Sequence, residues 1–254
     1  MPFPRLRHLS TAVLLLITAS SSVYAAAVPT EVTVRVRSHD AKFIGSGVGG
    51  MQLRIEDAVT GALLDSGMIS GGTGDTERLM KEPQTRGDTL ADDKTAHYTS
   101  TLMLEAPTRI RIRLTGPLDV PAAIQDLSLT TWVVPGKDIR GDGLVLHLPG
   151  LIVDARNLGV QDGSLPLIAD VTLMCGCPIT EGGLWDSADY EVQARIVGPD
   201  GTVATRDLAF GGEPNRFQGS YTPDAAGLYT VTIWAHNAKT GNTGAATYSI
   251  HHND

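Results

Sequence analysis

Both cysteines of the chain lie two residues apart in the stretch LMCGCPI, residues 173–179. The residues before them, IADVTL, alternate in a way that is typical of a β-strand. A period of two places Cys175 and Cys177 on the apolar, core-side face of this strand and Met174 on the opposite face. Pro178 cannot donate to a neighbouring strand, so we expect the strand to end there.

The spacing of the two cysteines argues against a purely stabilising disulfide. Residues i and i+2 of an extended strand are about 6.5–7 Å apart at Cα, which is the upper edge of what a disulfide tolerates. Gly176 could bend the chain and shorten that span. A bridge would then close a minimal ring, remove little entropy from the unfolded chain and be more easily reduced than an ordinary structural disulfide.

Three interpretations of the pair therefore stay open. The first is a redox-active Cys-Gly-Cys pair that carries out thiol–disulfide chemistry. The second is a soft-metal site, in which Cys175 and Cys177, with Met174 or a histidine nearby, hold an ion such as copper. The third is a pair with a packing role only. In each case Trp185, in the loop that follows, is expected to cover the pair as a shield.

The histidines add weaker candidates for metal binding. His236 follows the outward parity of its strand, so we expect it on a solvated or interface face. His251 and His252 could chelate an ion, although a frayed C-terminal tail is the expected state of such residues. No pair of carboxylates is singled out for acid–base work and no nucleophile motif is present, so a catalytic role is not favoured.

The first 25 residues have the pattern of a secretory signal peptide. Arg5 and Arg7 precede the apolar run TAVLLLITA, and Val23-Tyr24-Ala25 fits the small-residue rule for cleavage. The run is too short to span a bilayer comfortably, and no later segment is long and apolar enough. We therefore expect a periplasmic or secreted protein that is not an integral membrane protein after cleavage.

The charge of the chain restricts the classes of partner. It carries 20 basic and 28 acidic residues, and removal of the two leader arginines leaves 18 basic residues and a net charge of −10. Nucleic acid or an anionic membrane requires a basic face, so neither is favoured as a partner. Two cysteines form no disulfide framework, so the fold must rest on its hydrophobic core.

Alternation with a period of two dominates the rest of the chain. In TRIRIRLTG, residues 108–116, three aliphatic side chains alternate with three arginines, and similar stretches occur at 31–37 and 51–57. Six shorter strands with turns at near-regular spacing follow residue 160. We predict an all-β protein of two antiparallel β-sandwich domains, residues 26–160 and 161–254. The long connection at 70–97 is either functional or, as we favour, mobile or partly ordered.

Two resemblances support this prediction. PDAAGLYTVTIWAHNAKTGNTG, residues 223–244, resembles the closing hairpin of bacterial immunoglobulin-like domains through Asp224, Gly227 and Tyr229. The resemblance implies an immunoglobulin-like second domain with Tyr229 as its tyrosine corner. Val231 stands where antibody domains carry a cysteine, so the usual inter-sheet disulfide is ruled out. More weakly, residues 51–76 are similar to transthyretin-like or carboxypeptidase-regulatory-like sandwiches, which supports only a β-sandwich.

The leading functional prediction is an exported, non-catalytic binding or accessory protein that contacts another protein or a small ligand. Copper binding and thiol–disulfide exchange at Cys175 and Cys177 are the alternatives. The sequence names no particular ligand.

Overall fold

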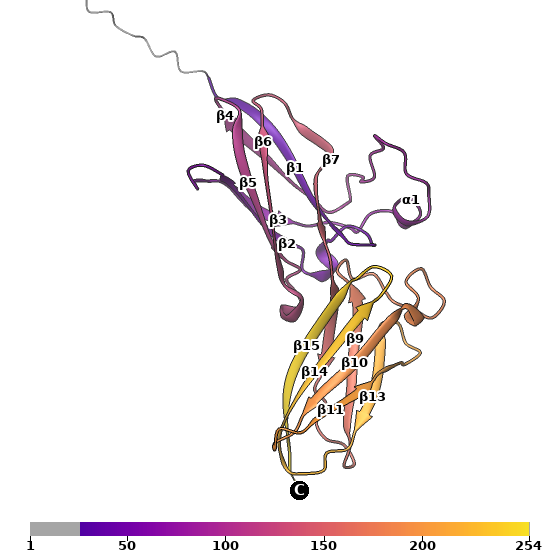
Figure 1. Cartoon of the computed structure of the whole chain (residues 1–254). Coiled ribbons are helices and arrows are strands. Elements are labelled where there is room, and N and C mark those ends of the chain that lie inside the picture. Colours follow the sequence, from indigo (N-terminus) through magenta and orange to yellow (C-terminus); the bar gives the residue numbers. More distant parts are fainter. Residues whose placement is uncertain (1–25, 254) are drawn as a thin grey trace, which may run out of the picture.

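The protein folds into two β-sandwiches that lie end to end (Figure 1). The computed structural model describes residues 26–253, so the predicted signal peptide lies outside the described residues. Within these residues strands dominate, with one short α-helix, α1 (Thr76–Met80), and three single turns of 3-10 helix: η1 (Ser46–Val48), η2 (Pro121–Ala123) and η3 (Ser187–Asp189). The prediction of an all-β protein is confirmed.

The first sandwich packs a three-stranded sheet against a four-stranded one. The smaller sheet has the order β4 (Tyr98–Leu104), β1 (Val28–Ser38), β7 (Ile139–Leu148). The larger sheet has the order β3 (Leu63–Ile69), β2 (Met51–Asp57), β5 (Thr108–Gly116), β6 (Gln125–Val133). All pairs are antiparallel except β1 and β7, which run parallel and depart from the predicted antiparallel architecture.

Alternating side chains explain these strands and their core. On β5, Ile110, Ile112 and Leu114 are almost wholly buried, while the arginines between them face outward. Inward side chains of both sheets form one apolar cluster, which includes Val32, Val34, Val36, Leu53 and Ile55. Burial of such side chains contributes roughly 1.5–3 kcal/mol each.

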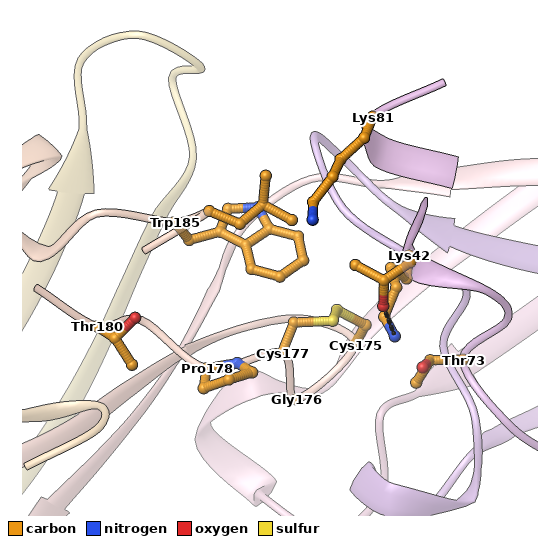
Figure 2. A pocket seen from close by; sticks show the side chains of 11 residues that line it. Lys42, Thr73, Lys81, Cys175, Gly176, Cys177, Pro178, Thr180 and Trp185 are labelled. Carbon is orange, nitrogen blue, oxygen red and sulfur yellow. Dashed lines mark hydrogen bonds between the residues drawn. A yellow bond between two sulfur atoms is a disulfide. The ribbon is translucent and has the colours of Figure 1, made fainter. Parts of the chain in front are cut away.

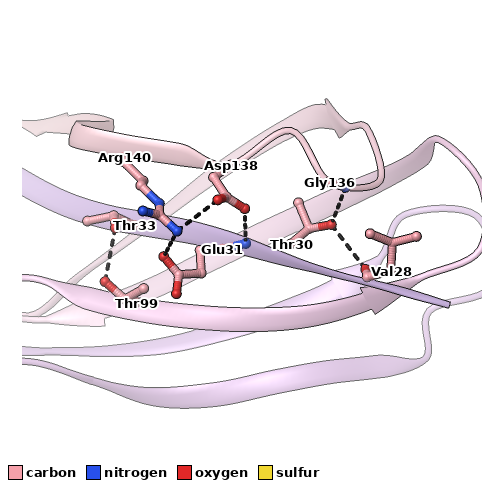
Figure 3. A network of polar contacts seen from close by, with 8 residues as sticks. All are labelled: Val28, Thr30, Glu31, Thr33, Thr99, Gly136, Asp138 and Arg140. Carbon is pink, nitrogen blue, oxygen red and sulfur yellow. Dashed lines mark hydrogen bonds and ion pairs between the residues drawn. The ribbon is translucent and has the colours of Figure 1, made fainter.

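A polar network holds the start of β7 against β1 (Figure 3). The β1–β7 register shifts between Val32 and Val34, so the chain bulges just after β7 begins. There Arg140 pairs with both Glu31 and Asp138 at 2.9 Å, and Asp138 also accepts the Glu31 N–H at 2.8 Å. Arg140 is thus neutralised by two carboxylates.

The second sandwich consists of two antiparallel four-stranded sheets. One has the order β12 (Ala209–Phe210), β13 (Arg216–Tyr221), β9 (Leu165–Leu173), β8 (Leu151–Arg156). The other has the order β11 (Val203–Asp207), β10 (Tyr190–Val197), β14 (Gly227–Asn237), β15 (Thr243–His252). Lettered in chain order as A, B, C, C′, D, E, F and G, these sheets are DEBA and C′CFG, which is the immunoglobulin-like arrangement.

The tyrosine corner lies where the sequence places it. Tyr229, at the start of β14, is fully buried, and its hydroxyl donates to the Ala225 carbonyl at 2.8 Å. The Ala225 N–H in turn donates to the same hydroxyl at 3.3 Å. With the strand order, this contact confirms that the second sandwich is immunoglobulin-like.

The division between the sandwiches differs from the predicted position at residue 160. Strand β8 pairs with β9 from Leu151 opposite Leu173 onward, so it belongs to the second sandwich. The Gly- and Pro-rich residues 157–166 include a tight turn, in which Gln161 and Ser164 exchange backbone hydrogen bonds around Asp162-Gly163. Positive φ at both central residues is the signature of a two-residue hairpin turn. The composition of such a turn resembles that of a linker. We therefore propose the boundary at residues 149–150.

The long connection at 70–97 has defined structure, contrary to the favoured expectation that it is mobile or partly ordered. Helix α1 begins at a capping Asp75 carboxylate, which accepts the Arg78 N–H at 2.8 Å. The Asp142 carboxylate accepts the N–H groups of Leu90 and Ala91 at 2.9 and 2.8 Å. These contacts fix the segment against the first sandwich, with α1 near the junction between the sandwiches (Figure 1).

Candidate functional site

The two cysteines lie in a tight turn that follows β9. The strand ends at Leu173, and the Gly176 N–H donates to the Leu173 carbonyl at 2.8 Å. Gly176 has φ of +74°, a left-handed conformation that favours glycine. The Cα atoms of Cys175 and Cys177 are 5.4 Å apart, and the two sulfur atoms form a disulfide. The bend expected at Gly176 is therefore present, but the strand stops before the cysteines rather than at Pro178.

This turn connects the cores of the two sandwiches. Cys175 and Cys177 are 3% and 4% exposed and belong to the apolar cluster of the second sandwich. Met174 is fully buried in the apolar cluster of the first. The parity expected from the sequence is thus present, with Met174 on the face opposite the cysteines.

The same geometry does not assemble the predicted soft-metal site. Met174 packs into the other core, and the disulfide sulfur atoms lack the thiolate charge that binds copper. Within residues 26–253, no group of three or more His, Cys, Asp or Glu side chains is placed to hold a metal ion. Copper binding by a reduced pair stays a prediction.

The disulfide borders a cavity of about 400 Å³ between the two sandwiches (Figure 2). The first sandwich and its long connection contribute polar side chains, and the second contributes mainly apolar ones. The residues that line it are Lys42, Thr73, Thr76, Lys81, Cys175, Gly176, Cys177, Pro178, Thr180, Leu184 and Trp185.

Trp185 forms one wall of this cavity. It is 8% exposed, and Figure 2 shows its indole ring beside the disulfide. The indole N–H donates to the Asp40 carbonyl of the first sandwich at 2.9 Å. The Thr180 N–H donates to the Trp185 carbonyl at 3.0 Å and fixes the loop behind the ring. The ring is therefore held in place before any ligand arrives.

Two lysines give the cavity its positive charge. Lys42 Nζ donates to Thr76 Oγ1 at 2.9 Å and to the Gly74 carbonyl at 3.4 Å. Lys81 Nζ pairs with Glu77 at 2.7 Å, and both side chains are more than half exposed. In the described part of the chain, no carboxylate forms an ion pair with Lys42. Lys42 is therefore the cation whose charge remains available to a ligand.

The lining residues from the first sandwich had no sequence signal of their own. Lys42 follows β1, and Thr73, Thr76 and Lys81 belong to the long connection. The unusual length of that connection, which function is one way to explain, is the only sequence feature that points to Thr73, Thr76 and Lys81, and nothing points to Lys42.

The histidines lie elsewhere. His236 is half-buried on the outward face of β14, opposite Glu191, as its parity predicts. His251 and His252 lie in β15, where they pair with Leu228 and Gly227 of β14. The expectation of a frayed tail is therefore wrong. Strand β14 extends far enough to pair with them, at the end of the second sandwich where the C-terminus lies (Figure 1). None of the three lines the cavity.

Comparisons with known proteins identify no family. No family model and no curated protein matches the chain. Among solved structures, the chicken interferon gamma receptor alpha chain is 12% identical with a TM-score of 0.33, and covers 89% of this chain and 98% of its own. Fibronectin(III)-like modules of Clostridium thermocellum CbhA are 9% identical with a TM-score of 0.25, covering 91% and 90%. The fold assignment rests on the strand order and the tyrosine corner, and the transthyretin-like resemblance stays a prediction.

The described residues contain no helix that is both long and apolar enough to span a membrane.

Proposed function

We propose that this is an exported, non-catalytic binding protein that holds a small organic anion in the cavity between its two sandwiches. The observation that carries the proposal is the meeting of Lys42, from one sandwich, with Trp185 and the disulfide, from the other, around a single cavity. The predicted signal peptide and the disulfide support a location outside the cytoplasm.

The composition of the cavity supports a ligand with an apolar body and one anionic group. Ligand sites are mostly apolar cavities of about 300–1,000 Å³ with a few polar groups that fix orientation. Here Trp185, Leu184 and the disulfide supply apolar surface, and Lys42 supplies an ammonium group. A carboxylate or sulfonate beside Lys42 would receive a charge-assisted hydrogen bond, the stronger kind. At about 400 Å³, the cavity suits a small molecule rather than a protein segment.

The absence of histidine and carboxylate side chains from the cavity favours binding over catalysis. Of the described residues that line the cavity, none is a histidine, aspartate or glutamate. Histidine and the carboxylates are the side chains that most often serve as general acids and bases. The disulfide also leaves no thiolate to act as a nucleophile.

The experiment is a fluorescence titration of the protein without residues 1–25. The ligand is 8-anilinonaphthalene-1-sulfonate, an aromatic anion whose fluorescence increases in apolar sites. We expect saturable one-site binding that benzoate displaces. Lys42→Gln should weaken it about tenfold, because one charge-assisted hydrogen bond contributes about 1.5 kcal/mol. The matched control is Lys137→Gln, which removes an exposed lysine outside the cavity.

A second variant, Leu184→Asp, tests the proposal independently in case Lys42→Gln misfolds. Leu184 is 46% exposed at the cavity, so Leu184→Asp places a negative charge there with little loss of packing. It should weaken dye binding while the near-UV circular dichroism stays that of the wild type. Equal affinity of Lys42→Gln, Leu184→Asp and wild type would refute the proposal, as would dye binding that no carboxylate displaces.

A further inference from the structure

One exposed sheet face carries four arginines although the protein as a whole is acidic. On β5, Arg109, Arg111 and Arg113 alternate with buried aliphatic residues and all point outward. Arg54 of β2 lies directly opposite Arg113 in the register. Neighbouring strands are about 4.8 Å apart and outward residues repeat about every 6.8 Å, so the four guanidinium groups occupy one patch.

Only part of this positive charge is neutralised within the face. Glu56 pairs with Arg54 at 3.5 Å and with Arg113 at 3.1 Å. In the portion that the structure describes, Arg109 and Arg111 form no ion pair, whereas Arg140 on the other sheet has two carboxylate partners (Figure 3). Arg109 and Arg111 lie about 6.8 Å apart along one face of β5, so their unpaired guanidinium groups offer an incoming carboxylate a charged partner.

The face also contrasts in charge with the rest of the molecule. Its outward charged side chains are four arginines, Glu56 and Asp126, which give a net charge of +2. The chain from residue 26 has a net charge of −10, so the remainder of it carries −12. An acidic partner is therefore attracted to this face and repelled elsewhere.

Trp132 adds an apolar anchor beside the arginines. It lies on β6 directly opposite Arg109 and is 61% exposed. Tryptophan and arginine are enriched in the parts of protein interfaces that carry most of the binding energy, whereas lysine is depleted. The four strands of this sheet contain no lysine. The residue types thus match a protein-binding surface better than a merely solubilising one.

A hollow of about 320 Å³ lies on the same face. Arg54 and Arg113 line it, together with Asp126 of β6. Glu56 already pairs with both of these arginines, which shows that a carboxylate binds on this face. The carboxylates of a partner would pair instead with Arg109 and Arg111.

We propose that this face, defined by Arg54, Arg109, Arg111, Arg113 and Trp132, docks an acidic segment of a protein partner. The site is separate from the cavity between the sandwiches and does not depend on its ligand. Carboxylates of the segment pair with the arginines, and an apolar side chain packs on the indole.

The test is fluorescence polarisation with a fluorescein-labelled peptide of alternating glutamate and leucine, titrated with the chain from residue 26. We expect binding that weakens with salt, since the contacts are charge pairs. Arg109→Glu with Arg111→Glu should reduce affinity at least tenfold. Trp132→Ala, which changes no charge, should reduce it about fivefold or more.

The matched control is Arg86→Glu with Arg195→Glu, which changes the net charge equally at exposed arginines outside this face. It should leave affinity within about twofold of wild type. An equal loss in this control would show diffuse attraction and overturn the proposal. So would failure of the peptide to bind at low salt, or Trp132-dependent binding of polygalacturonate, an acidic polysaccharide, in preference to the peptide.

Discussion

Reduction of the Cys175–Cys177 disulfide should cost the protein little stability. The bridge closes a loop of only three residues. In the chain-entropy model such a ring removes about 5.4 cal/mol/K from the unfolded state, which is about 1.6 kcal/mol at 25 °C. Reduction leaves both sulfur atoms in place, so the comparison isolates the cross-link from the packing of two nearly buried side chains.

The assay is urea unfolding of the oxidised and the dithiothreitol-reduced protein, followed by tryptophan fluorescence. For an m-value of about 2 kcal/mol/M, the midpoint of the second sandwich should fall by about 0.8 M on reduction. Cys175→Ala with Cys177→Ala serves as the control, because its midpoint should not respond to dithiothreitol. A fall of more than about 2 M would contradict the argument and make the cross-link essential to the junction.

Two further predictions concern the second sandwich. Tyr229→Phe removes the hydroxyl that bonds to Ala225 and should lower the free energy of unfolding by about 1–2 kcal/mol, measured by urea denaturation; an unchanged value would show that the corner is not stabilising. Burial raises the pKa of Asp170, but hydrogen bonds from Arg216 and Arg156 outweigh it and hold that pKa below its ordinary value. Its stabilising contribution is therefore present above pH about 4 and is lost as the pH falls through the folded-state pKa. Asp170→Asn should destabilise the protein at pH 7 and progressively less below pH 4; a constant loss across this range would contradict that linkage.

Local patterns predict the strands and their faces well, because alternation is a property of neighbouring residues. The buried Ile110 and Ile112, the position of Tyr229 and the bend at Gly176 all follow from short stretches of sequence. The boundary predicted at residue 160 separates β8 from its partner β9, because strand pairing is not encoded in neighbouring residues.

The cavity cannot be predicted from local sequence patterns, for the same reason. Lys42 and Lys81 meet Trp185 and the disulfide only because the two sandwiches pack end to end. A period of two places Cys175 on a core-side face but does not identify what lies across from it. The charge and the apolar wall of the site come from segments far apart in the chain, whose proximity depends on the whole fold.

The binding proposal is tested most directly by locating the bound dye. Intermolecular nuclear Overhauser effects between 8-anilinonaphthalene-1-sulfonate and the protein report which side chains the ligand touches. The account predicts cross-peaks from the aromatic protons of the dye to the Trp185 indole and the Leu184 methyl groups. Cross-peaks to Trp132 or Trp234 without any to Trp185 would contradict it.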